Sequence, residues 1–189
     1  PAPIAVNAEA GLLAVAVVAG APLAPKDVHR PEALRALGEK LARLHALDVD
    51  APRLDLAAAS ERYARLANGS EPVKLAGEAI RLLASLPLDG KACLCHNDLH
   101  PANLIQTPDS GLRLVDWEYA GLADPCFEFA VLAGQNGLAK AELAIALQGY
   151  RAAGGRAGLT GDLVTAWISL YHCIQQLWQA ATGKRPGRH

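Results

Sequence analysis

The feature that most constrains this chain is a polar loop, His96 to Asn103, set between short apolar segments. The loop reads His-Asn-Asp-Leu-His-Pro-Ala-Asn. Apolar residues precede it at 92–95 and follow it at 103–106 and 112–115, in runs typical of short strands. Thr107 to Gly111 separates the last two runs and has the composition of a hairpin turn. A hairpin at this place returns the chain to the loop, so polar groups on both sides of the hairpin are expected to meet.

The loop fits the pattern H-x-D-x-x-x-x-N, which is the pattern of the catalytic loop of protein kinases. Phosphoryl transfer needs an acceptor-only group beside the substrate hydroxyl, and Asp98 suits that role. It also needs hard oxygen ligands for Mg²⁺, which Asn103 can supply. His96 is expected to shape the loop by packing and hydrogen bonding.

A second acidic cluster follows the hairpin. Asp116 stands thirteen residues after Asn103 and opens the sequence Asp-Trp-Glu. A kinase places its main metal-binding aspartate at this point, directly after a strand. The alternative is that these side chains only form turns, since Asp and Asn are also common cap and turn residues.

The overall composition excludes some classes of protein. About half of the residues are hydrophobic and 20% are charged, which is typical of a folded domain with a core. The formal net charge is −1, so no basic face for nucleic acid is expected. The most apolar stretch, Gly11 to Ala24, is interrupted by Gly20 and Pro22 and has no basic leader, so neither a membrane span nor a signal peptide is predicted. A cytoplasmic protein is therefore expected.

The four cysteines are Cys93, Cys95, Cys126 and Cys173. They form neither a C-x-x-C pair nor a Cys/His spacing of the kind found in linear zinc motifs. They are therefore expected to be buried free thiols, which suit a reducing compartment.

The rest of the chain is mostly helical in pattern. Leu34, Leu37, Leu41 and Leu44 recur at intervals of three and four residues, which predicts an amphipathic helix over 31–47. Two short strands are expected at the start, at 4–6 and 11–18, and further helices at 57–66, 72–86, 127–133, 140–153 and 161–181. Turns are expected at Pro87 to Gly90 and a frayed basic tail at Gly183 to His189. A few strands, then helices with a hairpin inserted, make an α+β fold rather than alternating βαβ units.

Two longer segments resemble a known family. Cys95 to Ile105 and Leu114 to Gly121 are similar to the choline/ethanolamine kinase branch of the aminoglycoside phosphotransferase superfamily, and thiamine kinases share nearly the same Asp-Trp-Glu-Tyr-Ala-Gly sequence. The segments Leu37 to His45 and Ala123 to Ala130 resemble further parts of that family. The resemblance implies a protein-kinase-like fold in which residues 1–20 end a truncated small N-terminal lobe and its hinge, and residues 21–189 form the helical C-terminal lobe.

The resemblance also implies roles for single residues. Asp98 would be the catalytic base, and Asn103 and Asp116 would be ligands of Mg²⁺, with ATP as co-substrate. Val18 and Gly20 would lie where the backbone of the hinge meets the nucleotide. The resemblance implies supporting roles for three more residues, namely Asp124, Glu118 and His96. Asp124 would hold the following helix, Glu118 would brace the loop on the substrate side, and His96 would give structural support.

Three aromatic residues on the last predicted helix suggest a substrate class. Trp167, Tyr171 and Trp178 are separated by four and eleven residues from the first, so they lie close to one helical face. Aromatic faces attract quaternary cations, which favours choline or ethanolamine as substrate, then thiamine, then an aminoglycoside. The alternative is that the stripe is simply the buried face of a terminal helix.

Some parts of a kinase are not found in this sequence. No glycine-rich loop and no strand lysine precede Gly11, and Lys26 follows the presumed hinge. We therefore expect the parent protein to have a fuller small lobe. The rival hypothesis is a non-catalytic binding module that holds a cationic metabolite. The sequence does not specify an oligomeric state.

Overall fold

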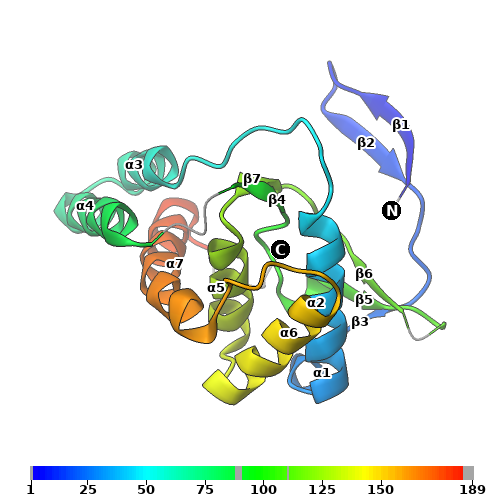
Figure 1. The fold of residues 1–189 in the computed structure, drawn as a ribbon. Helices are drawn as coiled ribbons and strands as arrows, with labels where there is room; N and C mark the ends of the chain where they lie inside the picture. The colour runs from blue at the N-terminus through cyan, green and yellow to red at the C-terminus, as the bar shows by residue number, and fades with distance from the viewer. Residues whose placement is uncertain (1, 88–90, 110, 185–189) are drawn as a thin grey trace.

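The computed structural model describes residues 2–87, 91–109 and 111–184 (Figure 1). Helices make most of this part of the chain, and its strands form small antiparallel sheets, so the expected α+β class is confirmed. The helices are α1 (Pro25–Val28), α2 (Pro31–His45), α3 (Leu56–Ala67), α4 (Ser70–Ser85), the 3-10 helix η1 (Pro101–Asn103), α5 (Pro125–Asn136), α6 (Lys140–Ala152) and α7 (Gly161–Thr182). The strands are β1 (Pro3–Asn7), β2 (Leu12–Val15), β3 (Ala21–Pro22), β4 (Cys93–Cys95), β5 (Leu104–Gln106), β6 (Leu112–Leu114) and β7 (Gly121–Ala123).

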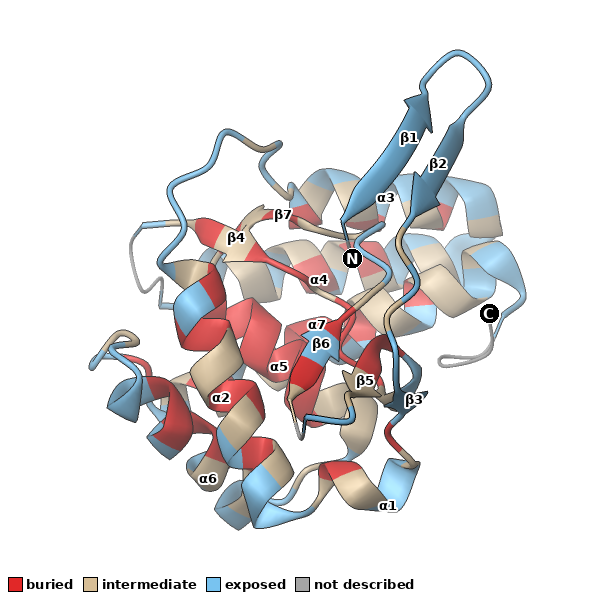
Figure 2. Ribbon diagram, turned by 90° about the vertical axis from the view of Figure 1, so that its right-hand side faces the viewer, coloured by how far each residue is buried: buried red, intermediate tan, exposed pale blue. Residues whose placement is uncertain are grey.

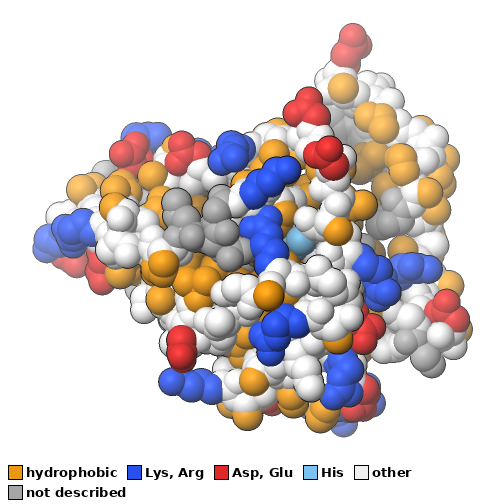
Figure 3. All heavy atoms as spheres, in the orientation of Figure 1, with side chains coloured by type: hydrophobic (Ala, Val, Ile, Leu, Met, Phe, Trp, Pro, Cys, Tyr) orange, Lys and Arg blue, Asp and Glu red, His pale blue; other side chains and the backbone are white. Residues whose placement is uncertain are grey.

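The first two strands form a hairpin that stands away from the helical body (Figures 1 and 2). Its turn is closed by a bond from the Ala10 amide to the Asn7 side chain at 3.0 Å, and Gly11 adopts a φ of 63° there. Every residue of β1 and β2 is exposed, and hydrophobic side chains gather over this hairpin (Figure 3). The two strands predicted at the start of the chain are thus present, but none of their residues is buried.

The predicted hairpin after the polar loop is present as the antiparallel pair of β5 and β6. On its other side β5 pairs with β3, where Ala21 lies opposite Gln106. Gly20 makes this approach possible, because a side chain there would collide with the carbonyl oxygen of Gln106. Strand β3 was not predicted, since its two residues lie in a segment rich in Pro and Gly.

Strand β4, which leads into the polar loop, pairs with β7. The sequence did not indicate β7, because three small and apolar residues carry no periodicity of their own. The pairing places Gly121 opposite Cys95 and brings the segment after Asp116 beside the start of the loop.

Helices α2 and α6 pack closely against each other in the lower part of the view in Figure 1. Leu34, Leu37 and Leu41 are fully buried, as the periodicity required. Glycines at the contact let the backbones approach, because a side chain at Gly149 would meet the carbonyl oxygen of Arg35. Helix α2 ends two residues earlier than predicted, at His45.

Helix α5 lies in the middle of the body, with α7 on one side (Figures 1 and 2). Residues 125–133 are buried, so the helix has no solvent face over that length. The ring of Phe129 packs edge-to-face on that of Tyr150, with ring centroids 5.1 Å apart. Helices α3 and α4 cover the far side of α7. The helices predicted in this half are confirmed, with α5 longer than expected at both ends.

Two expectations fall partly outside the described residues, namely positions 88–90 of the predicted turn and 185–189 of the basic tail. Among the residues that are described, no helix combines the length and the apolar character needed to cross a bilayer.

Candidate active site

The polar loop brings Asp98 and Asn103 into direct contact. The Asn103 side-chain nitrogen donates to the backbone oxygen of Asp98 at 3.0 Å and to its carboxylate Oδ2 at 2.8 Å. Both residues are buried, and η1 sets their spacing. Because both bonds use the amide nitrogen, they leave the amide oxygen of Asn103 available to bind another group.

Two further side chains hold the Asp98 carboxylate. Gln135 on α5 donates to Oδ1 at 2.6 Å, and His100 Nε2 lies 3.4 Å from Oδ2. Burial raises the pKa of Asp98, but hydrogen bonds from His100 and Gln135 and the charge of nearby histidines outweigh it, so the pKa is lowered. The carboxylate is therefore ionised at neutral pH.

Gln135 was not among the predicted site residues. Phe127, Val131 and Gln135 follow one another at intervals of four on α5 and all line the same cavity. A polar residue at the end of such an apolar stripe was the signal that could have identified it.

The start of the loop is fastened to α5 by one buried carboxylate. Glu128 accepts the His96 amide at 2.7 Å and the Asn97 amide at 2.9 Å. The His96 ring bonds the Val115 carbonyl oxygen at 2.9 Å and lies against Trp117, with centroids 4.6 Å apart. His96 thus connects the loop to the segment that carries Asp116.

Asp116 lies in that segment, directly after Val115. The Val115 amide donates to the Asn103 carbonyl oxygen at 3.1 Å, so the backbone at Asp116 lies beside Asn103. Asp116 adopts a φ of 62°, in the left-handed region that Asp tolerates better than most residues. Its side chain is exposed. The hairpin therefore returns the chain to the loop as the sequence predicted.

A cavity of about 120 Å³ opens beside Asp98. Its lining is mostly aromatic and aliphatic and comes from α3, α5, α7 and the loops between strands. The Trp178 indole donates to the Tyr119 hydroxyl at 3.1 Å, and Gln175 donates to the Tyr171 hydroxyl at 2.6 Å. The lining residues are Leu54, Leu56, Ala59, Tyr63, Asn97, Asp98, Tyr119, Phe127, Val131, Gln135, Tyr171, Ile174, Gln175 and Trp178.

The expected aromatic set is only partly brought together. Tyr171 and Trp178 line the cavity, whereas Trp167 does not. The Trp167 indole donates to the Pro87 carbonyl oxygen at 3.3 Å, and its side chain is 1% exposed. The three residues share a helical face, but eleven residues span about 16 Å along a helix axis. Trp167 therefore packs in the core, as the alternative reading of the stripe required for that residue.

Two tyrosines that the sequence did not single out, Tyr63 and Tyr119, join the cavity instead. Tyr119 stands next to Glu118, so its closeness to the acidic cluster was a usable signal. Glu118 itself is exposed on the turn and does not line the cavity.

The remaining predicted residues lie around this centre. Asp124 caps α5, with its carboxylate accepting the Cys126 amide at 2.8 Å. Val18 is half-buried in the segment that joins β2 to β3, and Gly20 ends that segment against β5. All four cysteines are free and buried, as expected.

Comparison with known sequences places the chain among phosphotransferases. Residues 1–164 match the family described as "Phosphotransferase enzyme family". Protein LicA of Haemophilus influenzae is 41% identical over 56 residues, which are 30% of this chain and 21% of that protein. Ethanolamine kinase 2 of Rattus norvegicus is 28% identical over 135 residues, covering 62% of this chain and 35% of that protein. The matched parts thus span about a fifth to a third of these relatives.

Solved structures share the fold. Choline kinase LicA from Streptococcus pneumoniae superposes with a TM-score of 0.78 at 20% identity, over 99% of this chain and 67% of that one. LicA in complex with AMP gives a TM-score of 0.77 at 21% identity, over 95% and 64%. These likenesses confirm the kinase-like fold. Since the family match covers residues 1–164 of the 189, the chain belongs to the phosphotransferase enzyme family.

Proposed function

We propose that this protein transfers the γ-phosphoryl group of ATP to the hydroxyl of a small cationic alcohol of the choline or ethanolamine type. One observation carries the proposal: the carboxylate of Asp98 belongs to the kinase-like loop and also lines the aromatic cavity. A hydroxyl bound in that cavity would therefore meet an ionised acceptor.

Asp98 is proposed as the catalytic base. Gln135 holds one carboxylate oxygen, and Asn103 and His100 lie at the other. This fixed orientation lets Asp98 accept the hydroxyl proton as the oxygen attacks phosphorus, and the lowered pKa keeps the carboxylate ready for it at neutral pH.

Asn103 and Asp116 are proposed to hold Mg²⁺. The donor set fits, because the two bonds from Asn103 to Asp98 leave the amide oxygen of Asn103 available. The backbone at Asp116 lies beside Asn103, and Asp116 is exposed. Bound Mg²⁺ would neutralise charge on the nucleotide phosphates. The AMP complex of a structural neighbour supports the use of a nucleotide, and the backbone at Val18 and Gly20 is proposed to meet it.

The cavity supports a cationic substrate with one charge. Tyr119, Tyr171 and Trp178 offer aromatic surface, and a cation against such surface gains about 0.5–2 kcal/mol per contact. Asp98 is the single carboxylate among the described lining residues. An aminoglycoside, which carries several ammonium groups, would need more acidic side chains. Thiamine, with one cationic ring, is the second candidate.

The test is ATP consumption by the full protein with Mg²⁺, offered choline, ethanolamine, thiamine and an aminoglycoside separately. We expect turnover with one of the amino alcohols. Asp98→Asn should lower the turnover by about 10²–10⁴-fold, whereas the matched control Asp48→Asn, in an exposed loop, should leave it unchanged.

Acceptor binding is measured alongside by calorimetry. Equal turnover in Asp98→Asn and wild type would reject Asp98 as the base. Binding of choline without any turnover would instead favour the rival hypothesis, a non-catalytic module that holds a cationic metabolite.

A further inference from the structure

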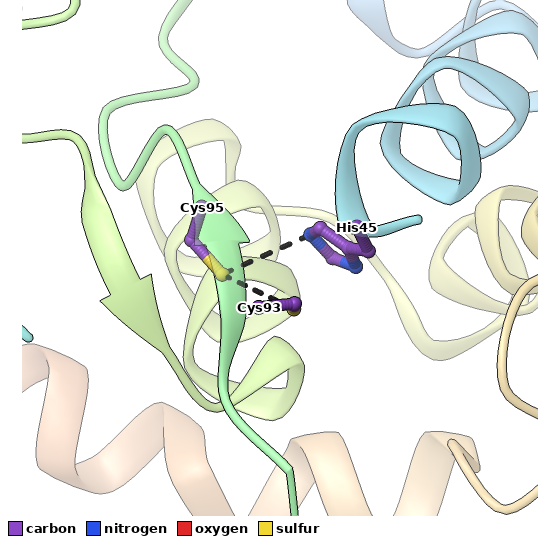
Figure 4. Close-up of side chains that lie close together, drawn as sticks. All are labelled: His45, Cys93 and Cys95. Carbon is purple, nitrogen blue, oxygen red and sulfur yellow. Dashed lines mark hydrogen bonds between the residues drawn. The ribbon is translucent and has the colours of Figure 1, made fainter. Parts of the chain in front are cut away.

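Three side chains with metal-binding atoms lie close together near the start of the polar loop. His45 stands at the end of α2, and Cys93 and Cys95 project from β4 toward it (Figure 4). The two sulfurs are 3.8 Å apart, and Cys95 Sγ lies 3.8 Å from His45 Nε2. All three ligand atoms lie within 4.8 Å of one another. This cluster plays no part in the proposed phosphoryl transfer.

The spacing of these atoms suits tetrahedral zinc. Zn–S bonds of about 2.3 Å and Zn–N bonds of about 2.0 Å at tetrahedral angles place two sulfurs about 3.8 Å apart, and sulfur and nitrogen about 3.5 Å apart. The separations of 3.8 Å for Cys93–Cys95 and for Cys95–His45 are therefore close to those of a formed site, and the atoms of the third pair lie within 4.8 Å. Residues two apart on a strand point to the same side, which explains how Cys93 and Cys95 can act together.

The surroundings of His45 favour a ligand role. Its Nδ1 is hydrogen bonded to the Tyr150 hydroxyl at 3.0 Å, which orients the ring so that Nε2 faces the sulfurs. Metal-binding histidines commonly have such an outer partner on the other nitrogen. Glu128 Oε2 lies 3.5 Å from His45 Nε2 and also accepts the His96 amide, so it connects the cluster to the polar loop. The His45 and Glu128 side chains are 2% and 0% exposed.

We propose that His45, Cys93 and Cys95 form a binding site for Zn²⁺ with three protein ligands. Sulfur and imidazole nitrogen are ligands that Zn²⁺ prefers and Mg²⁺ does not, so this site is distinct from the proposed magnesium site at Asn103 and Asp116. A linear zinc motif is absent because the histidine comes from a distant helix. The bound ion would connect α2 and β4.

The test is titration of the reduced, metal-free protein with Zn²⁺, and with Co²⁺ as a spectroscopic probe. We expect one equivalent to bind, a thiolate-to-cobalt charge-transfer band, and a higher Tm with Zn²⁺. Cys93→Ala and Cys95→Ala should each weaken binding by more than about 100-fold and remove or reduce the band. Cys173→Ala, a buried cysteine on α7, is the matched control and should bind as the wild type does.

A second measurement needs no variant. Bound Zn²⁺ should protect Cys93 and Cys95, and not Cys173, from alkylation during brief exposure to denaturant, read by mass spectrometry. Absence of stoichiometric binding by the folded, reduced protein would overturn the proposal. So would binding that persists unchanged in both cysteine variants, or equal alkylation with and without Zn²⁺.

Discussion

The β1–β2 hairpin and helix α5 are both rich in apolar residues, yet they differ fully in what surrounds them. Ile4 is 71% exposed and Leu12 is 65% exposed, whereas Phe129 and Leu132 on α5 are 0% exposed. The hairpin is held by its own backbone bonds and its turn. Helix α5 is held by packing on its neighbours and by Glu128, which bonds the polar loop.

The local residue pattern and the packing of distant elements thus contribute separately to the fold. Strand pairing at the hairpin follows from residue type and turn chemistry alone, since two apolar runs and a glycine turn suffice to place it. A two-stranded ribbon of this kind is at best marginally stable by itself. In α5 the same kind of apolar residue contributes burial, and the free energy of unfolding should depend on it.

The largest expected effect comes from truncating the centre of α5. Phe129→Ala removes a ring that is fully buried against Tyr150, so the free energy of unfolding should fall by about 3–5 kcal/mol. Urea unfolding followed by circular dichroism measures it. A fall below 1 kcal/mol would show that α5 is not the centre of the core.

The next effect concerns the carboxylate that joins α5 to the loop. Glu128→Gln keeps the shape of the side chain but places its NH₂ group against the backbone amides of the loop, which are also donors. The free energy of unfolding should therefore fall by about 1–3 kcal/mol at neutral pH. Burial raises the pKa of Glu128, but bonds and charge from His45 outweigh it, so its pKa lies below the usual 4.5. The stability that the carboxylate contributes is therefore present above about pH 4.5 and lost as the pH falls through its lowered pKa.

The difference in unfolding free energy between the wild type and Glu128→Gln should consequently shrink as the pH falls below 4.5. Unfolding is followed in the presence of a chelator. Glu61→Gln, an exposed residue on α3, is the control and should show no such trend. A difference that stays constant through this range would mean that Glu128 is not ionised in the native state.

Glycine packing gives the third comparison. A side chain at Gly149 would collide with the carbonyl oxygen of Arg35, so Gly149→Ala should destabilise the body by about 1–3 kcal/mol. A side chain at Gly77 on α4 would meet only the end of the Arg81 side chain at ordinary contact distance, so Gly77→Ala should stabilise by up to about 1 kcal/mol. Opposite shifts in Tm are expected, and a Gly149→Ala variant as stable as the wild type would contradict the close packing of α2 on α6.

The smallest effect is expected in the hairpin. Leu13 is 65% exposed, so Leu13→Ala should change the free energy of unfolding by no more than about 0.5 kcal/mol. The amides of β1 and β2 should also exchange with solvent much faster than those of α5. Slow exchange in the hairpin would show that something covers it in solution and would remove the contrast between the two regions.

Much of this fold could be predicted because its signals are local. The leucine pattern of α2, the turn between β5 and β6 and the polar loop each depend on neighbouring residues, and all are present. Strands β3 and β7 were missed because two or three residues acquire strand geometry only by pairing with distant partners. The division into two lobes was expected from the family resemblance alone and stays a prediction.

The site was predicted unevenly for the same reason. Asp98 and Asn103 are close in sequence, so their contact followed from spacing. Gln135, Tyr63 and Tyr119 reach the cavity from separate elements. Gln135 and Tyr119 carried weak local signals, whereas Tyr63 is identified only by the packing of α3. The separation of Trp167 from Trp178 depends on distance along the helix, which a helical-face argument ignores.

The short pairing of β3 with β5 has a mechanical consequence. The Leu23 amide donates to the Leu104 carbonyl oxygen at 2.8 Å, and Leu104 follows Asn103 directly. The chain that leaves the hairpin therefore joins the body through β3, which pairs with the strand that directly follows the polar loop. A movement of the hairpin would be passed through this pairing to the backbone next to Asn103. A few backbone hydrogen bonds between β3 and β5 thus link the hairpin mechanically to the polar loop.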